Sequence, residues 1–228
     1  MTGKTILILG GGIGGIVAAR ELRKHLNAHH RIILVDKSAI HSLPASYLWV
    51  MVGWRKPSAI QKPLSLLEKY GIEFHHATVQ TIDLNHRSVT TDRATIHFDY
   101  LIVALGAELA PHNVPGLMEC AHSFYTLESA DRLASTLNTF SGRTIAVVVS
   151  SLPYKCPPAP YEAAFLLESY FSQKMPGNVT IKVFTPEQAP LSTAGPEASQ
   201  MLHELLHSRG ITLTTQHKIM SVNPMKNK

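Results

Sequence analysis

Short runs of apolar residues alternate along this chain with longer stretches in which apolar residues recur at helical spacing. The first run, Lys4–Leu9, is followed by a cluster of glycines and then by the helical pattern of Ile16–Leu26. A second apolar run, Arg31–Val35, comes after that helix. Short apolar runs joined by amphipathic helices are typical of parallel strands, so the pattern predicts an α/β fold.

The same alternation starts again in the second half of the chain, after the segment Pro111–Pro115. The spacing predicts helices over Leu127–Phe140, Tyr161–Gln173 and Pro196–Arg209, and strands over Thr144–Val149, Val179–Phe184 and Ile211–Thr215. The sequence therefore predicts tandem Rossmann-like domains of the FAD/NAD(P)-binding type, over residues 1–113 and 114–228.

The remainder of the first domain is less regular. Lys37–Pro63 is rich in Pro, Trp and Ser, and it predicts an irregular loop that lines a ligand site. After it, the sequence predicts a short helix over Leu64–Tyr70 and a strand over Glu73–Val79. A meander is predicted over Val89–Phe98, and a buried strand that ends at glycine over Tyr100–Ala107.

The glycine cluster after the first strand has the pattern of a nucleotide-binding turn. Gly10, Gly12 and Gly15 satisfy GxGxxG, and Asp36 follows the second strand about twenty residues later. The glycines allow a tight turn and close approach to a pyrophosphate at the helix N-terminus, and the acid can hold a ribose hydroxyl. The order of strand, glycines, helix, strand and acid predicts a dinucleotide site; the alternative is a plain turn with chance glycines.

The corresponding turn of the second domain lacks these glycines. Ser150–Cys156 follows the strand, and its prolines cannot offer backbone N–H groups to a phosphate. Binding of NAD(P)H at this second turn is therefore disfavoured.

Cys156 lies at this strand-to-helix junction and is a candidate redox nucleophile. A position near a helix N-terminus favours thiolate, because the helix dipole attracts negative charge there. The alternative is a buried, unreactive cysteine in a proline-rich loop, which is the commoner situation for an isolated cysteine.

The composition is that of an ordinary soluble globular protein and excludes several classes. The 228 residues are 45% hydrophobic, and no apolar run approaches the length needed to span a bilayer. The net charge of +5 is dispersed, so no nucleic-acid partner is expected. With only Cys120 and Cys156, a disulfide framework is not expected, and His29–His30 and His75–His76 lack metal-binding spacing. We expect a cytoplasmic location, in solution or at the membrane face.

The chain resembles the sulfide:quinone oxidoreductases and the flavoprotein subunit of flavocytochrome c sulfide dehydrogenase. The residues that carry the resemblance are Gly10–Gly15 with Asp36, Pro44 with Gly53–Arg55, Tyr100–Gly106 and Cys156–Glu162. The last segment is the specific one, since the others are shared with many flavoproteins. The resemblance covers essentially the whole chain and implies the N-terminal portion of a family member, ending inside the second domain.

The resemblance implies that FAD is the cofactor. Its pyrophosphate would lie at the glycine turn, its adenosine ribose at Asp36 and its isoalloxazine beside Pro44. The backbone near Val79 and the turn at Ala104 would enclose the nucleotide. The implied FAD-binding residues are Gly10, Gly12, Ile13, Gly14, Gly15, Asp36, Lys37, Pro44, Val79, Ala104 and Gly106.

The implied reaction is the oxidation of sulfide. A redox-active cysteine pair would pass two electrons through a persulfide to FAD and onward to quinone or a cytochrome, and Cys156 matches one member of that pair. Glu162 matches a carboxylate suspected of proton handling, for which burial could raise the pKa. Its alternative role is to stabilise a helix N-terminus. Sulfide and quinone are thus the implied substrates, and the resemblance allows peripheral membrane contact and a homodimer.

This sequence departs from the family pattern in several places. The second cysteine of the pair, a further FAD-contacting segment and the quinone and membrane contacts would lie beyond Lys228. Ala39–Leu48 has no cysteine for a covalent flavin, Leu105 replaces a small polar residue, and Cys120 is out of register with a third family cysteine.

Two alternative functions stay open. One is an NADH:quinone oxidoreductase, which would need a glycine-rich second turn, and the other is a non-catalytic fragment that binds FAD weakly or not at all.

Overall fold

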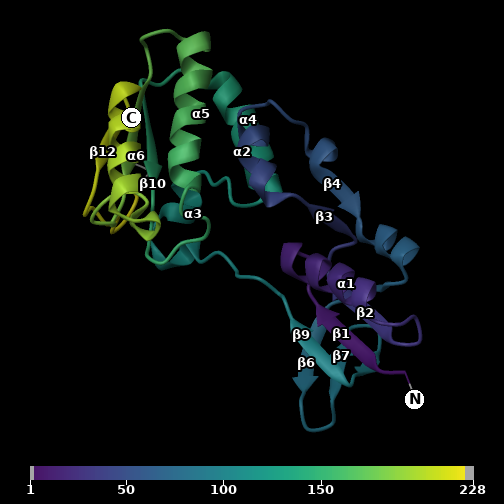
Figure 1. The fold of residues 1–228 in the computed structure, drawn as a ribbon. Coiled ribbons are helices and arrows are strands. Elements are labelled where there is room, and N and C mark those ends of the chain that lie inside the picture. Colours follow the sequence, from purple (N-terminus) through teal and green to yellow (C-terminus); the bar gives the residue numbers. More distant parts are fainter. Residues whose placement is uncertain (1–2, 224–228) are drawn as a thin grey trace. The chain divides into compact units, whose positions relative to one another are not determined.

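The N-terminal strand, helix and strand are β1 (Thr5–Leu9), α1 (Ile13–His25) and β2 (Arg31–Asp36) in the computed structural model, which describes residues 3–223 (Figure 1). β1 lies between β2 and β9 (Tyr100–Val103), and β5 (Glu73–His76) lies on the outer side of β2. All pairings in this sheet are parallel. The predicted α/β class with parallel sheets is therefore confirmed.

Both faces of this sheet are buried. The central residues of β1 and β2, Leu7–Leu9 and Ile32–Val35, are almost completely shielded from solvent. One face packs against α1 around Ala19, and the other packs against an antiparallel sheet around Val89. Burial on both faces explains why these strands are continuous apolar runs in the sequence.

The antiparallel sheet consists of β6 (Val79–Asp83), β7 (Ser88–Thr91) and β8 (Thr95–His97). The sequence predicted one strand over Glu73–Val79, but β5 ends at His76 and β6 begins at Val79. Between the two strands the amide of Thr78 donates to Asp92 Oδ1 at 2.7 Å. This bond holds the chain where it turns from one sheet into the other.

The second half of the chain contains a parallel sheet of β10 (Thr144–Val148), β11 (Thr180–Phe184) and β12 (Thr212–Thr214). Its helices are α3 (Leu117–Cys120), α4 (Leu127–Thr139), α5 (Ala159–Lys174) and α6 (Pro196–Ser208). The helices and strands predicted here are present, with ends shifted by a few residues. α5 begins earlier than predicted, because Pro160 lies in the first turn, where no hydrogen-bonded N–H is required.

The segment predicted as an irregular loop contains a helix, α2 (Tyr47–Met51). The side chains of Leu48, Val50 and Met51 are buried, and α2 contacts α4 and α5. The expectation of irregular structure is wrong here, because tertiary packing stabilises a helix that is too short to form alone.

Short elements complete the framework. β3 (Ile40–Ser42) and β4 (Gln61–Pro63) form an antiparallel pair at the two ends of the predicted loop. The short helix predicted over Leu64–Tyr70 is present as a 3₁₀ helix, η3. Further 3₁₀ helices are η1 (Pro44–Ser46), η2 (Pro57–Ile60), η4 (Pro111–Asn113) and η5 (Ser192–Ala194).

The chain folds as two units, and neither is continuous in sequence from end to end. One contains the chain up to Leu43 together with Ser58–Leu109, and the other contains Pro44–Pro57 together with the chain from Ala110 onward. The division into domains 1–113 and 114–228 stays a prediction, and it differs from these units chiefly in the placement of Pro44–Pro57.

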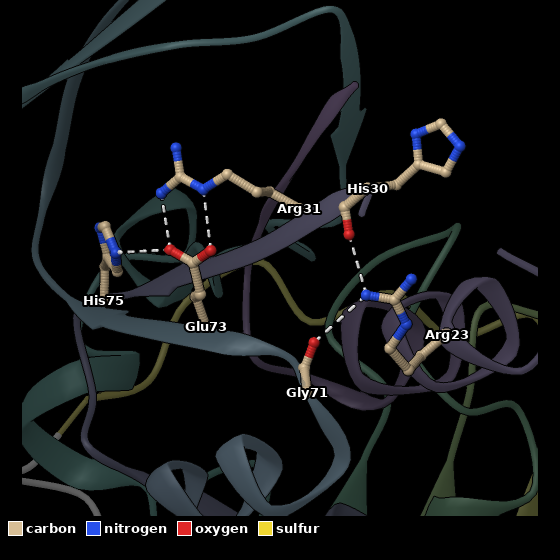
Figure 2. A network of polar contacts seen from close by, with 6 residues as sticks. All are labelled: Arg23, His30, Arg31, Gly71, Glu73 and His75. Carbon is tan, nitrogen blue, oxygen red and sulfur yellow. Dashed lines mark hydrogen bonds and ion pairs between the residues drawn. The ribbon is translucent and has the colours of Figure 1, made fainter. Parts of the chain in front are cut away.

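A polar network connects the amino ends of β2 and β5 in the first unit (Figure 2). Arg31, at the start of β2, donates to both carboxylate oxygens of Glu73, at the start of β5, over 2.9 and 2.7 Å. Arg23 of α1 donates to the carbonyl oxygens of His30 and Gly71. The hydrogen bonds from Arg31 lower the pKa of Glu73 below its usual value. The network lies at the end of the sheet opposite the glycine turn.

Candidate functional site

The glycine turn between β1 and α1 has backbone contacts that exclude side chains at two positions. Gly10 has a φ of +107°, and its amide donates to the carbonyl oxygen of Val35 at 2.8 Å. A Cβ atom on Gly10 would lie 2.2 Å from the carbonyl oxygen of Ala104, and one on Gly15 would lie 1.8 Å from that of Gly10. Gly10 and Gly15 are therefore required for the packing of strand, turn and helix.

Gly12 has a different role, because no part of the described chain fills the space beside it. Its backbone is extended, with φ −74° and ψ −175°, and no described heavy atom lies within 4 Å of the position of a Cβ. Gly12, Ile13 and Gly14 are exposed at the N-terminus of α1, whose first N–H groups have no partner within the helix. The open turn is thus suited to an anionic phosphate.

Asp36 is tied to this turn from the end of β2. Its carboxylate accepts hydrogen bonds from the backbone amides of Gly11 and Ser38. A carboxylate offers about four lone-pair sites, so the predicted bond from a ribose hydroxyl can still be accepted. Sequence reasoning missed the bond that fixes the glycine turn, because Gly11 is not one of the defining positions of GxGxxG.

Two histidines contact backbone carbonyl groups of residues next to Asp36 in the structure, Gly11 and Lys37. Nδ1 of His41 lies 3.0 Å from the carbonyl oxygen of Gly11, and Nε2 of His76 lies 3.0 Å from that of Lys37. The side chain of Lys37 is exposed, so the contact with His76 fixes its backbone only.

The other residues predicted to contact FAD in this unit lie at or after the carboxyl ends of the strands. Ala104 follows β9, and its amide donates to the carbonyl oxygen of Leu9 at 2.8 Å. Gly106, with a φ of +77°, continues that turn, and Val79 begins β6 shortly after β5 ends. Open parallel sheets bind ligands at this edge. The structure brings the glycine turn, Asp36 and Ala104 together there.

Large apolar side chains are exposed next to this edge. Ile13 and Val17 of α1 are 52% and 53% exposed, and Val103 and Leu105, on either side of Ala104, are 59% and 57% exposed. A Cβ on Gly14 would lie 3.9 Å from that of Ala104, so the two segments are adjacent. Sequence reasoning did not identify this group, although exposed apolar residues gathered in one place are a signal of a binding surface.

The remaining predicted site residues belong to the second unit. Pro44 is exposed at the start of η1. Cys156 is exposed in the loop between β10 and α5, so it is not the buried cysteine of the alternative interpretation. Cys120 is half-buried in α3, and both cysteines are free thiols.

The backbone around Cys156 is held by hydrogen bonds and is locally strained. The φ of Cys156 is +54°, in the left-handed region, which costs a residue other than glycine roughly 1–2 kcal/mol. Consecutive carbonyl oxygens of the loop accept hydrogen bonds: that of Lys155 from the Tyr125 hydroxyl at 2.7 Å, that of Cys156 from the Ala159 amide at 2.9 Å, and that of Pro157 from the Tyr154 hydroxyl at 3.1 Å.

Tyr125 keeps its proton for this contact. Burial, with a smaller contribution from nearby Cys156, raises the pKa of Tyr125 to about 12. The hydroxyl therefore remains a donor to the Lys155 carbonyl throughout the neutral range.

The first turn of α5 has few backbone groups to offer a thiolate. Pro160 has no N–H, the amide of Ala159 is bonded to the Cys156 carbonyl, and that of Glu162 is bonded to the Pro158 carbonyl. Attraction between α5 and a negatively charged Cys156 sulfur would act chiefly through the helix dipole. Glu162 is exposed, so the burial expected for it is absent and that expectation is wrong for this chain.

Comparison with known proteins finds family matches along nearly the whole chain. Residues 4–152 match the family model of the pyridine nucleotide-disulphide oxidoreductases. Residues 132–222 match the model of the central part of the sulfide dehydrogenase (flavocytochrome c) flavoprotein chain.

Individual relatives include proteins of sulfide and of NADH metabolism. The sulfide-quinone reductase of Aquifex aeolicus is 29% identical over 98% of this chain and 53% of its own length. A type II NADH:quinone oxidoreductase of Staphylococcus haemolyticus is 28% identical over 58% of this chain and 33% of its own length. The solved structure of the A. aeolicus sulfide:quinone oxidoreductase matches with a TM-score of 0.89 at 25% identity, over 97% of this chain and 53% of that one.

These matches confirm the resemblance to the sulfide:quinone oxidoreductases that the sequence predicted. The chain spans about half the length of the curated sulfide:quinone relatives that it matches.

Proposed function

Because the chain belongs to the pyridine nucleotide-disulphide oxidoreductase family, we propose that it is part of an FAD-dependent enzyme that oxidises sulfide at Cys156 and reduces a quinone. The observation that carries the proposal is an exposed cysteine in a loop that hydrogen bonds hold on both sides. That loop lies within the residues that match the sulfide dehydrogenase flavoprotein model.

The cofactor is FAD, which the proteins of this family bind. The glycine turn and Asp36 are suited to bind FAD. The turn leaves open space beside Gly12 at a helix N-terminus, where a pyrophosphate is stabilised, and Asp36 has lone pairs left for a ribose hydroxyl. When bound, FAD supplies an acceptor for two electrons.

Cys156 and Glu162 have separate tasks in the proposed reaction. A sulfur–sulfur bond forms between hydrosulfide and Cys156, which releases two electrons, and one quinone takes up these electrons and two protons to become a quinol. Glu162, exposed in the first turn of α5, moves protons to and from this region.

The proposed acceptor also bears on where the protein works. Quinones are held in membranes, so peripheral contact with the cytoplasmic membrane face is part of the proposal. Within residues 3–223, no helix has the length and apolar character needed to cross a bilayer.

An NADH:quinone oxidoreductase is the second candidate, because a relative over part of the chain carries that name. The turn after β10 argues against nicotinamide binding in the second unit, since Ser150–Cys156 has no glycine. The acid that follows β11, Glu187, is only 4% exposed, so it is not available to a ribose.

The test is the flavin absorption spectrum of the purified, FAD-loaded chain, recorded without oxygen before and after addition of sulfide. We expect sulfide to bleach the flavin. Cys156→Ser should retain FAD and lose the bleaching, whereas Cys120→Ser, the matched control, should behave like the original chain. Bleaching that persists in Cys156→Ser contradicts the role of Cys156, and bleaching by NADH alone favours the second candidate.

A further inference from the structure

A buried carboxylate organises the polar interior of the second unit. Glu187 follows β11 and is 4% exposed. Its Oε2 atom accepts hydrogen bonds from the hydroxyls of Tyr154 at 2.9 Å, Tyr161 at 2.6 Å and Thr185 at 3.0 Å, and its Oε1 atom accepts one from Ser192 at 3.2 Å. A buried carboxylate with this many donors is satisfied without a partner cation.

This cluster carries one negative charge, on Glu187, and its tyrosine hydroxyls stay protonated. Burial acts to raise the pKa of Glu187, but the hydrogen bonds from Tyr161, Tyr154, Thr185 and Ser192 outweigh it, and the net effect lowers that pKa. Burial raises the pKa of Tyr154 and of Tyr161. The tyrosines are therefore donors to an ionised carboxylate, which gives stronger hydrogen bonds than neutral pairs do.

The two tyrosines come from the two sides of Cys156. Tyr154 precedes Cys156 in the loop, and its hydroxyl is also 3.1 Å from the carbonyl oxygen of Pro157. Tyr161 follows Cys156 in the first turn of α5 and is 1% exposed. One carboxylate thus anchors both ends of the segment that carries the thiol.

The backbone of Glu187 is itself fixed. Its carbonyl oxygen accepts a hydrogen bond from the amide of Gln216 at 2.9 Å, just after β12, and its amide donates to the hydroxyl of Thr185 at 3.2 Å. Glu187 is therefore hydrogen-bonded to the residues that follow β11 and β12 as well as to the loop.

The first unit uses an acid in the corresponding place. Asp36 ends the strand that follows α1, and it binds the amide of Gly11 in the turn after β1. Glu187 comes after the strand that follows α5, and it binds Tyr154 in the turn after β10. In each unit an acid at the end of the second strand or shortly after it is hydrogen-bonded to the turn after the first strand, and in the second unit that turn carries Cys156.

We propose that Glu187 is a positioning residue for Cys156, holding the loop so that the backbone of Cys156 keeps its left-handed conformation, through Tyr154 and Tyr161. This inference rests on the reactive role proposed above for Cys156. Because Cys156 is already exposed, loosening the loop gives a reagent little additional access. A change in thiol reactivity therefore reports the position of the loop.

The test measures the rate at which iodoacetamide alkylates Cys156 in the full chain, at one fixed pH and with Cys120 replaced by Ser. Glu187→Gln and Tyr154→Phe should each change the rate at least threefold, in the same direction. The double variant should change the rate no more than the larger single effect, because both substitutions break the same hydrogen bond, that between Tyr154 and Glu187. Tyr170→Phe is the matched control, since it removes a hydroxyl bonded to Asn138 further along α5, and it should leave the rate unchanged.

Thermal unfolding is recorded for every variant. If Glu187→Gln does not fold, Tyr154→Phe alone decides, because it removes only one hydroxyl. Lowered stability with an unchanged alkylation rate shows that Glu187 is merely structural and overturns the proposal. Additive effects of the two substitutions overturn it as well. Alkylation needs neither FAD nor sulfide, so failure of sulfide to bleach the flavin counts against the proposed function and leaves this test unaffected.

Discussion

Gly12 and Gly15 lie about one helical turn apart, yet an added side chain would meet open space at the first and backbone at the second. We expect Gly12→Val to change stability by no more than about 1 kcal/mol, the usual scale for an N-cap position, and to abolish FAD retention by filling the phosphate space. Gly15→Ala should lower stability by at least about 2 kcal/mol. Flavin absorbance and thermal unfolding measure the two effects, and normal flavin content in Gly12→Val would refute the binding assignment.

Cys156 has a backbone conformation that glycine adopts without strain. Cys156→Gly should therefore be more stable than Cys156→Ala by about 1 kcal/mol. At Cys120, which lies in a helix, alanine is the better residue, so Cys120→Ala should be more stable than Cys120→Gly. Urea unfolding of the four variants checks both orders. Equal stability of the two Cys156 variants would mean that the loop relaxes without cost.

At the scale of elements, the ion pair between β2 and β5 makes part of the stability dependent on pH. The pKa of Glu73 is lowered by Arg31, so the stabilisation is present above the unfolded pKa of about 4.3 and is lost as the pH falls through the lower folded value. The pair is substantially exposed, so the contribution is below about 1 kcal/mol.

Unfolding by urea at a pH of about 6 and of about 3 measures this contribution. Glu73→Gln should destabilise the protein at the higher pH and have little effect at the lower one. Glu68→Gln, in η3, is the control. A destabilisation by Glu73→Gln that is the same at both values would show that its charge is not responsible.

Most elements could be predicted from the sequence, because β1, α1 and β2 have a long pattern that few other structures satisfy. α2 could not, since Tyr47–Met51 is short and its helical form depends on α4, which lies far along the chain. β5 and β6 merged in the prediction for a similar reason. The turn between them is fixed by Asp92, whose partnership with Thr78 has no local signal.

The candidate site was predictable only where its residues follow one another in a motif. The glycine turn, Asp36 and Cys156 belong to such motifs. The hydroxyls around Glu187 come from Tyr154, Tyr161, Thr185 and Ser192. No regular spacing in the sequence connects these four residues. The exposure of Glu162 also depends on which face of α5 is packed, and the sequence did not decide this.

At the scale of the whole molecule, FAD binding should couple to folding of the unit that contains the glycine turn. A ligand that binds only the native state stabilises it by about 2.7 kcal/mol when its concentration is a hundredfold above the dissociation constant. We expect the midpoint of thermal unfolding to rise with added FAD in the original chain and to stay constant in Gly12→Val. A rise of equal size in both would place the bound FAD elsewhere.

The excursion of Pro44–Pro57 into the second unit has a consequence for the order in which the protein is made. The chain passes from one unit to the other after Leu43, after Pro57 and after Leu109. During synthesis α2 therefore leaves the ribosome long before α4, the helix that it contacts. The apolar side chains of α2 stay exposed to solvent until α4 and then α5 have been synthesised. A nascent chain of this protein is therefore open to chaperones and to aggregation at a stage when its first sheet is already complete.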